Sequence, residues 1–193
     1  MRVIAGTARS LPLKTPEGMD TRPTTDRIKE TLFNMLQAYV PGAVFADLFS
    51  GSGGIGIEAL SRGAEKAYFI ENAPKAVSCI QQNLAFTKTA DRAIVIKQDV
   101  FSGLSGIREE NVDVIFMDPP YKSGYEKNVL ALLQNMRFVT EDTLIVAEAA
   151  LDTDFSYLET MGYTVEKEKR YKTNKHMFIR KTERAERTAA SGN

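Results

Sequence analysis

Short apolar runs alternate with segments of helical periodicity between residues 44 and 148 of the chain. VFADLF at 44–49 and VDVIFMD at 112–118 are almost continuously apolar, which is typical of strands covered on both faces. Strands that alternate with helices predict a mainly parallel sheet with helices packed on both sides. Because such sheets bind ligands at the carboxyl ends of their strands, functional residues are expected directly after each apolar run.

The predicted elements are joined by short connections. Strands are expected at 44–49, 67–71, 93–99, 112–118 and 143–148, and helices at 56–63, 74–86, 125–137 and 155–162. An earlier helix has Thr24 or Thr25 as its N-cap and ends at Pro41. The alternating segments YTVEKEKRYK and KHMFIRK predict a terminal antiparallel hairpin, and RVIAG and LPLKT predict a small N-terminal hairpin. The expected fold class is α/β, Rossmann-like, with a mainly parallel seven-stranded sheet.

These patterns divide the chain into an N-terminal hairpin and helix extension at 1–40, one α/β domain at 41–182, and a tail at 183–193 that we expect to be disordered. No apolar run reaches about 18 residues, so no membrane-spanning helix is expected. The first ten residues lack the apolar segment of a signal peptide. One cysteine cannot form an internal disulfide, and one histidine excludes an HExxH zinc site. We therefore expect a cytoplasmic, monomeric protein that holds no metal.

A glycine-rich segment, DLFSGSGGIG at 47–56, follows the first strand. Glycine suits this place because the turn into the helix is tight, and because the backbone has to approach a ligand without an intervening Cβ atom. The spacing of Gly51, Gly53 and Gly56 is weak evidence by itself, since a glycine-rich turn without a ligand has the same appearance. Its position between a strand and a helix favours a nucleotide-like ligand.

Acidic residues follow the next two strands. Glu71 lies 20 residues beyond Gly51, where a carboxylate can accept hydrogen bonds from both ribose hydroxyls of a nucleoside. Asp99 is placed to accept from an adenine amino group. Each has a simpler interpretation, as a surface glutamate and as the N-cap of the segment that starts at Val100. Together with Asp47 they fit a nicotinamide dinucleotide as well as S-adenosylmethionine.

The fourth strand ends in Asp118-Pro119-Pro120-Tyr121, and this motif separates the two cofactors. Two prolines remove two backbone donors and fix both φ angles, so the Asp118 carboxylate and the Pro119 carbonyl can point together into a cleft. Two neighbouring acceptors suit an NH2 group, which has two hydrogens to donate. The ring of Tyr121 can stack on a base that has been turned out of its helix. A proline-rich turn without function is the less favoured interpretation here.

With these motifs the sequence resembles class I S-adenosylmethionine-dependent methyltransferases that modify exocyclic amines. The stretches RVIAGTARSLPLKTP, RPTTDRIKETLFNML, DLFSGSGGIGIEALSRGA, FIE and DPPY narrow the resemblance to the RsmD family, over nearly the whole chain from Arg2 to about Lys181. Members of that family are bacterial enzymes that methylate the N2 amine of a guanine in 16S ribosomal RNA. RPTTDR is the family-specific part, whereas the glycine loop and DPPY are shared more widely.

The resemblance implies a set of roles. Residues implied to hold S-adenosylmethionine are Asp47, Ser50, Gly51, Gly53 and Gly56 at its methionine end, Glu71 at the ribose, and Asp99 and Val100 at the adenine. Asp118 and Pro119 would orient the guanine amine in a loop stiffened by Pro120, and Tyr121 would stack on the base. The reaction is then an in-line displacement at the sulfonium methyl group, in which positioning supplies most of the catalysis. The amine proton would leave to Asp118 or to water.

Charge is unevenly distributed although the chain has 25 basic and 25 acidic side chains. Residues 1–35 carry six basic and four acidic groups and residues 165–193 carry nine and four, whereas residues 36–164 carry ten and seventeen. Overall neutrality excludes indiscriminate binding of polyanions, and two basic ends remain compatible with RNA. Candidate RNA contacts are Arg9, Arg22, Thr24 and Arg27 near the first helix and Lys169, Arg170 and Lys172 in the final hairpin. The rival interpretation of the first group is a solvent-exposed helix face. The rival interpretation of the second is an edge strand whose charged side chains prevent pairing with another chain.

Other functions remain open at this point. A DNA adenine-N6 methyltransferase usually carries a larger recognition domain, and a protein glutamine-N5 enzyme more often has Asn at the position of Asp118. A nicotinamide oxidoreductase explains the glycines but leaves DPPY without a role, and a non-catalytic ribosome-assembly factor is a third class.

Cys79, inside a predicted helix, is expected to be a buried apolar residue rather than a nucleophile. His176 is expected at the surface or rim of the last strand. The expected RNA partner is 16S ribosomal RNA within a small-subunit particle or assembly intermediate.

Overall fold

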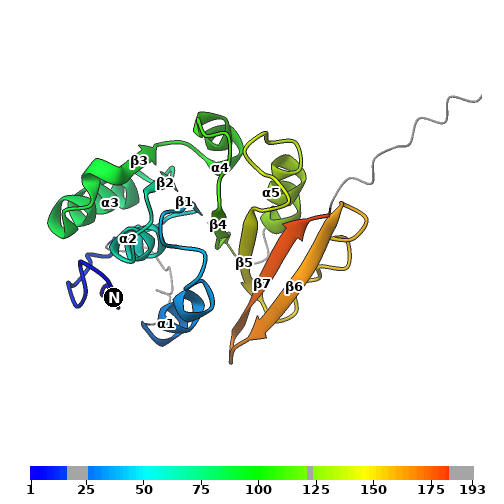
Figure 1. The fold of residues 1–193 in the computed structure, drawn as a ribbon, viewed down its shortest axis with the longest axis horizontal. Coiled ribbons are helices and arrows are strands. Elements are labelled where there is room, and N and C mark those ends of the chain that lie inside the picture. Colours follow the sequence, from blue (N-terminus) through cyan, green and yellow to red (C-terminus); the bar gives the residue numbers. More distant parts are fainter. Residues whose placement is uncertain (17–25, 121–123, 183–193) are drawn as a thin grey trace, which may run out of the picture.

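The computed structural model describes residues 1–16, 26–120 and 124–182. Within them, seven strands form one sheet in the order β3-β2-β1-β4-β5-β7-β6 (Figure 1). The strands are β1 Val44–Leu48, β2 Lys66–Ile70, β3 Ala93–Ile96, β4 Val114–Met117, β5 Leu144–Ala150, β6 Tyr163–Arg170 and β7 Asn174–Lys181. β1 to β5 are parallel to one another, and β7 lies antiparallel between β5 and β6. This arrangement confirms the predicted fold class.

Helices cover both faces of the sheet, as the apolar strands predict (Figure 1). The helices are α1 Asp26–Met35, α2 Gly54–Ser61, α3 Pro74–Thr87, α4 Val100–Gly103 and α5 Tyr125–Leu133. One core joins α1, α2 and α3 to alternate strand residues such as Phe45 and Phe116. A second core joins α4 and α5 to the intervening residues, such as Ala46 and Ile115. Because successive side chains point to opposite faces, one strand contributes to both cores.

The strand register brings the ends of the central strands to a common edge. Leu48 of β1 pairs with Ile70 of β2 on one side and with Met117 of β4 on the other. Met117 in turn pairs with Ala147 of β5. The residues that follow these positions therefore meet at the carboxyl edge of the sheet, where the sequence predicts the ligand site.

The N-terminal segment is closed by one antiparallel bridge of its own, and it packs on α2 through a buried carboxylate. Arg2 and Pro12 form the bridge, which is smaller than the predicted hairpin. Glu58 of α2 accepts hydrogen bonds from the backbone of Ile4 at 2.8 Å and of Ala5 at 3.0 Å. Lys29 of α1 is buried against the same carboxylate at 3.3 Å. The Glu58 carboxylate thus contacts both the N-terminal segment and α1.

One predicted element is wrong. Residues 155–162 form a series of turns rather than a helix. Asp154 accepts hydrogen bonds from the backbone and hydroxyl of Ser156, and the hydroxyl of Thr160 bonds the carbonyl of Tyr157. Such local side-chain bonds compete with the helical backbone pattern. The predicted tail at 183–193 lies outside the described residues. No described helix is long and apolar enough to cross a membrane.

Candidate active site

The turn after β1 has the backbone geometry for which glycine is required. Gly51 and Gly53 have φ angles of 55° and 79°, in the left-handed region that disfavours residues with a Cβ atom. Gly56 lies so close to the sheet that an added Cβ would be 2.4 Å from Cε1 of Phe69. Ser50 fixes the turn, since its hydroxyl donates to the carbonyls of Asp47 at 2.6 Å and Ile70 at 3.2 Å. The turn therefore holds α2 against β1 and β2.

Asp47 is the innermost acid of the site. Asp47 is only 2% exposed, and its carboxylate accepts a hydrogen bond from the backbone N–H of Gly56 at 2.9 Å. Burial raises the pKa of Asp47 to about 7, the Gly56 N–H opposes this rise, and the charge of Glu71 adds to it. The site thus contains a carboxyl group that is poised to bind or release a proton near neutral pH.

Glu71 lies directly after β2 and faces the glycine turn. One carboxylate oxygen accepts from the N–H of Gly51 at 2.9 Å, and the other accepts from Asn72 and Ala73, also at 2.9 Å. These three bonds fix the orientation of the carboxylate. A carboxylate has about four lone-pair positions, so the group can still accept a hydrogen bond from a ligand hydroxyl.

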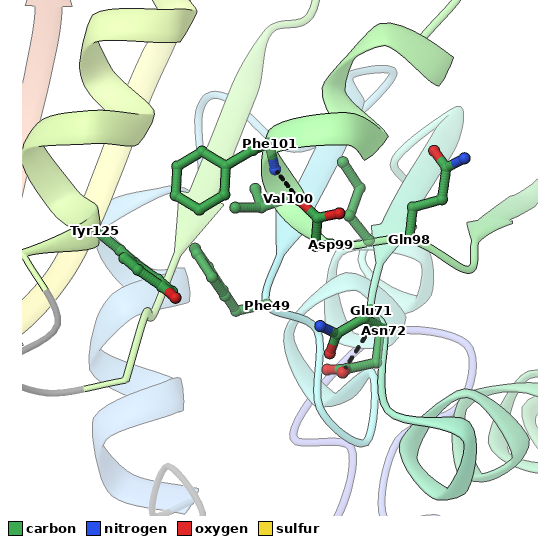
Figure 2. A pocket seen from close by; sticks show the side chains of 9 residues that line it. Phe49, Glu71, Asn72, Gln98, Asp99, Val100, Phe101 and Tyr125 are labelled. Atoms are coloured by element: carbon green, nitrogen blue, oxygen red, sulfur yellow. Dashed lines mark hydrogen bonds between the residues drawn. The ribbon is translucent and has the colours of Figure 1, made fainter.

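A pocket of about 240 Å³ opens between the ends of β1, β2 and β3 (Figure 2). Asp99 lies at its rim and caps α4, with one oxygen accepting from Phe101 N–H at 3.0 Å and Ser102 N–H at 3.1 Å. Hydrogen bonds from Ser102 hold the pKa of Asp99 below its usual value. Val100 lines the pocket. The capping and the ligand-binding interpretations of Asp99 are therefore compatible, because both backbone bonds go to the same oxygen.

Aromatic rings line the same pocket. Phe49 stacks on Tyr125 with ring centroids 6.1 Å apart, and Phe101 meets Tyr125 edge-on at 5.2 Å (Figure 2). Phe49 has a positive φ of 62°, a conformation that is uncommon for a residue with a side chain of this size. None of these three residues is predicted from the sequence, although Phe49 lies within the glycine-rich segment and Phe101 directly follows Val100. They give the pocket apolar walls beside its acidic rim, as a planar heterocycle requires.

Asp118 follows β4 and is surrounded by other acids. Among the described residues its carboxylate has no hydrogen-bond or ion-pair partner. Its pKa lies well above the usual value because the side chain is desolvated and because the charges of Glu148, Asp47 and Glu126 surround it. Pro119 is buried and Pro120 is exposed. The predicted stacking residue Tyr121 lies outside the described residues.

A groove of about 390 Å³ separates the start of α1 from the turn between β6 and β7. It brings together four of the predicted RNA contacts, which are Arg27, Lys169, Arg170 and Lys172. Tyr171 also lines the groove, and the Lys169 ammonium lies 6.0 Å from the centre of its ring. The two predicted basic segments thus meet in space although they are more than a hundred residues apart in the sequence.

The remaining basic candidates lie elsewhere. Arg9 is exposed in the N-terminal turn, beside Thr7 and Ala8, which bond Ser61 at the end of α2. Arg22 and Thr24 lie outside the described residues. Lys175, three residues beyond Lys172 in the final hairpin, is buried and donates to the carbonyl of Thr153 at 2.8 Å.

Two further expectations concern single residues. Cys79 is buried in α3, as predicted, and its thiol contacts the carbonyl of Lys14 at 3.1 Å. His176 is not at the surface: it is 0% exposed and bonds Glu148 at 3.0 Å. The expectation was wrong because β7 lies inside the sheet, between β5 and β6, although it is the last strand in the sequence.

Comparison with known proteins agrees with this fold. The strand order and the structural neighbours are those of class I methyltransferases. A hypothetical protein of Thermus thermophilus, TTHA0928, superimposes with a TM-score of 0.79 at 27% identity, covering 93% of this chain and 99% of that one. The family model described as conserved hypothetical protein 95 matches residues 1–180. The chain therefore belongs to this family, the RsmD family.

Two relatives illustrate the similarity within the family. The Bacillus subtilis protein YlbH is 42% identical over 164 residues, which cover 84% of this chain and 88% of YlbH. A Haemophilus influenzae protein named ribosomal RNA small subunit methyltransferase D is 35% identical over 173 residues, covering 88% of both chains. The resemblance seen in RPTTDR, the glycine loop and DPPY is thus confirmed at the level of the family.

Proposed function

We propose that this protein transfers a methyl group from S-adenosylmethionine to the exocyclic N2 amine of a guanine in 16S ribosomal RNA. The observation that carries the proposal is the strand register, in which Met117 of β4 pairs with Leu48 of β1, so that Asp118 follows β4 beside Phe49, a residue that lines the pocket. Relatives named for methylation of small-subunit ribosomal RNA support the substrate class.

The pocket residues fit the proposed cofactor. Glu71 has an oriented carboxylate for a ribose, and the rings of Phe49 and Phe101 flank a space that suits an adenine. Asp47 and the turn at Gly51 and Gly53 would hold the methionine end. S-adenosylmethionine supplies a methyl group on a positive sulfur, which is an electrophile that needs no activation by the protein. What the chain has to supply is alignment and exclusion of water.

Asp118 would act on the target amine. Its carboxylate and the Pro119 carbonyl would each accept one amine hydrogen, which directs the nitrogen lone pair toward the methyl group. The surrounding acids favour proton uptake by Asp118, because a carboxylate among like charges is a stronger base than an isolated one. A free carboxylate beside Pro119 therefore suits both the orientation of the amine and the later acceptance of its proton.

The groove lined by Arg27, Lys169, Arg170 and Lys172 is the proposed RNA contact. Its cations would bind phosphates, and Tyr171 offers a ring for a base. Cation contacts with phosphate raise affinity and make it sensitive to salt, whereas shape and neighbouring ribosomal proteins would select the site. We propose a monomer that acts in the cytoplasm on a small-subunit particle or an assembly intermediate.

Mass mapping of 16S ribosomal RNA tests the substrate. RNA from a strain without this gene is compared with RNA from the same strain supplied with the wild-type gene or with the Asp118→Ala variant. One N2-methylguanine should be absent in the deletion strain and restored only by the wild type. An unchanged set of N2-methylguanines in the deletion strain would contradict the 16S assignment.

Charge reversal in the groove tests the RNA contact separately. For the double variant Arg170→Glu and Lys172→Glu we expect about tenfold weaker RNA binding, and a slope of affinity against salt reduced by about one to two. Arg108→Glu with Arg137→Glu is the matched control, because both arginines are exposed in loops that precede strands, at the opposite edge of the sheet. Equal effects of the two pairs would refute a specific role of the groove.

A further inference from the structure

A buried acid and histidine lie beside Asp118 and have no part in the function proposed so far. Glu148 of β5 is 4% exposed and His176 of β7 is 0% exposed. One oxygen of Glu148 lies 3.0 Å from Nε2 of His176, and the other accepts a hydrogen bond from the side-chain amide of Asn174. Because a carboxylate only accepts, Nε2 of His176 is the donor in this pair.

The register places this pair in line with Asp118. Met117 of β4 pairs with Ala147 of β5, so Asp118 and Glu148 are the next residues on neighbouring parallel strands. Glu148 itself pairs with His176 across the antiparallel β5 and β7. The His176 ring also meets the ring of Phe116 edge-on, with centroids 6.1 Å apart. Three adjacent strands thus carry an acid, an acid and a histidine along the carboxyl edge.

Charged and titratable groups reach this cluster from β1, β5, α5 and the turn after β6. Asp47 of β1, Glu126 of α5 and Glu148 of β5 act on Asp118, and each raises the pKa of that carboxyl group. From the other side, Tyr171 approaches Nδ1 of His176 at 3.3 Å through its hydroxyl. Since Tyr171 lines the basic groove, the chain of contacts runs from that groove to the neighbour of Asp118.

Stability alone does not account for the pair. Its neighbours on the same sheet face, Phe116 and Phe178, belong to an apolar core. Replacing a buried ion pair by apolar side chains is often neutral or stabilising, so a packing role needs neither an acid nor a histidine. What the pair provides is a carboxylate at a fixed place beside Asp118, with both of its oxygens satisfied by β7.

We propose that Glu148, held by His176 and Asn174, is a positioning residue that makes Asp118 the acceptor of the target amine's proton. This inference rests on the proposed function. After the new carbon–nitrogen bond forms, one nitrogen–hydrogen bond breaks, its electron pair stays on nitrogen, and the proton goes to a carboxylate oxygen of Asp118. The charge of Glu148 favours this uptake, because protonation of Asp118 removes the repulsion between the two acids.

Carbon-13 NMR of protein labelled at its aspartate carboxyl groups tests the inference without relying on activity. The Asp118 signal is identified by its absence in Asp118→Asn. Its titration midpoint should fall by about one pH unit in Glu148→Gln, because a neutral amide no longer repels the carboxylate. The control is Glu109→Gln, whose carboxylate pairs with Lys66 at 2.7 Å and does not act on Asp118. This control should leave the midpoint unchanged.

A second variant keeps the test decisive if Glu148→Gln does not fold. Glu148→Gln with His176→Gln replaces the pair by two amides that can bond each other, and it should lower the midpoint by the same amount. In single-turnover methyl transfer, the part of the pH profile in which the rate rises with pH should shift to lower pH by the same amount. The maximal rate, reached at high pH, should fall about threefold.

The outcomes separate this inference from the proposed function. A midpoint that stays in place in both Glu148 variants overturns the inference, whether or not the protein methylates RNA. A midpoint that moves while the rate profile stays in place also overturns it, because Asp118 then does not receive the proton. A wild-type protein without transferase activity refutes the proposed function, and the NMR result is unaffected by that failure.

Discussion

The two halves of the carboxyl edge hold their acids in different ways. At the ends of β1, β2 and β3, the carboxylates of Asp47, Glu71 and Asp99 each accept backbone N–H groups from the turn or the first helical turn that follows the same or a neighbouring strand end. At the ends of β4 and β5, Asp118 has no such bond among the described residues, and Glu148 is held by side chains of β7. The first half is organised by local turns, and the second by strands distant in sequence.

This difference matches the two tasks of the proposed reaction. A cofactor site has to present acceptors in fixed directions, and backbone N–H groups orient a carboxylate without adding mobile side chains. A site that accepts a proton benefits from a carboxyl group whose charged form is disfavoured. Asp47 lies on the boundary, because it has a backbone partner and also contributes to the acidic surroundings of Asp118.

Asp118→Ala should give the largest effect. Removing the carboxylate takes away the acceptor that would orient the amine and receive its proton, so the rate of transfer should fall about 1,000-fold or more. Calorimetry should show an affinity for S-adenosylmethionine within about threefold of wild type, because the cofactor half is intact. Asp152→Ala, an exposed acid that follows β5 at the same edge, is the control and should retain normal transfer. Loss of cofactor binding in Asp118→Ala would remove the distinction between the halves.

The variant Asp47→Asn tests whether Asp47, at the boundary of the two halves, destabilises the folded protein through its buried charge. The folded pKa of about 7 exceeds the usual 3.8, so folding takes up a proton between these values and stability falls as pH rises through this window. Asn keeps an acceptor for Gly56 N–H and has no charge to bury. Urea unfolding should find the variant more stable than wild type by about 2–3 kcal/mol near pH 8, with the difference shrinking toward pH 4.

An unchanged dependence of stability on pH in Asp47→Asn would show that the backbone bond from Gly56 fully offsets the burial of the charge. Asp47 would then be an ordinary member of the cofactor half, with no free-energy cost from its buried charge. Asp91→Asn serves as the control, because Asp91 is an exposed acid in the short 3-10 helix before β3, and its replacement should leave the pH dependence of stability unchanged.

The contrast also explains which parts of the site could be predicted from the sequence. Asp47, Glu71 and Asp99 adjoin the strands and turns that position them, so apolar runs and glycines were enough to place them at one edge. Asp118 is predictable in the same way, because it ends an apolar run and two prolines follow it directly. These predictions depended on chain neighbours, and the parallel register then brought them together.

Contacts between strands distant in sequence were not predictable in this way. KHMFIRK alternates like a surface strand, yet β7 is inserted between β5 and β6, so His176 and Lys175 are buried. Nothing in the pattern of one strand reveals which strands will flank it. The joining of Arg27 with Lys169 and Lys172 in one groove has the same origin, since it depends on how α1 and the last hairpin pack.

Glu71→Gln should give the smallest effect and should affect binding alone. The glutamine oxygen can replace one carboxylate oxygen, but its NH2 group faces backbone donors and loses at least one of the three N–H bonds. The remaining acceptor for a ribose hydroxyl is then less well oriented. We expect the dissociation constant for S-adenosylmethionine to rise about tenfold, which corresponds to about 1.4 kcal/mol.

The control for this variant lies at the other end of the same strand. Glu65 is exposed just before β2, and Glu65→Gln changes the same charge without touching the pocket, so its affinity for the cofactor should equal that of wild type. At saturating cofactor, Glu71→Gln should transfer methyl groups at nearly the wild-type rate, because Glu71 acts on binding and Asp118 acts on the amine. A large fall in this saturated rate would mean that Glu71 also aligns the methyl group, and the two halves would then share the catalytic task.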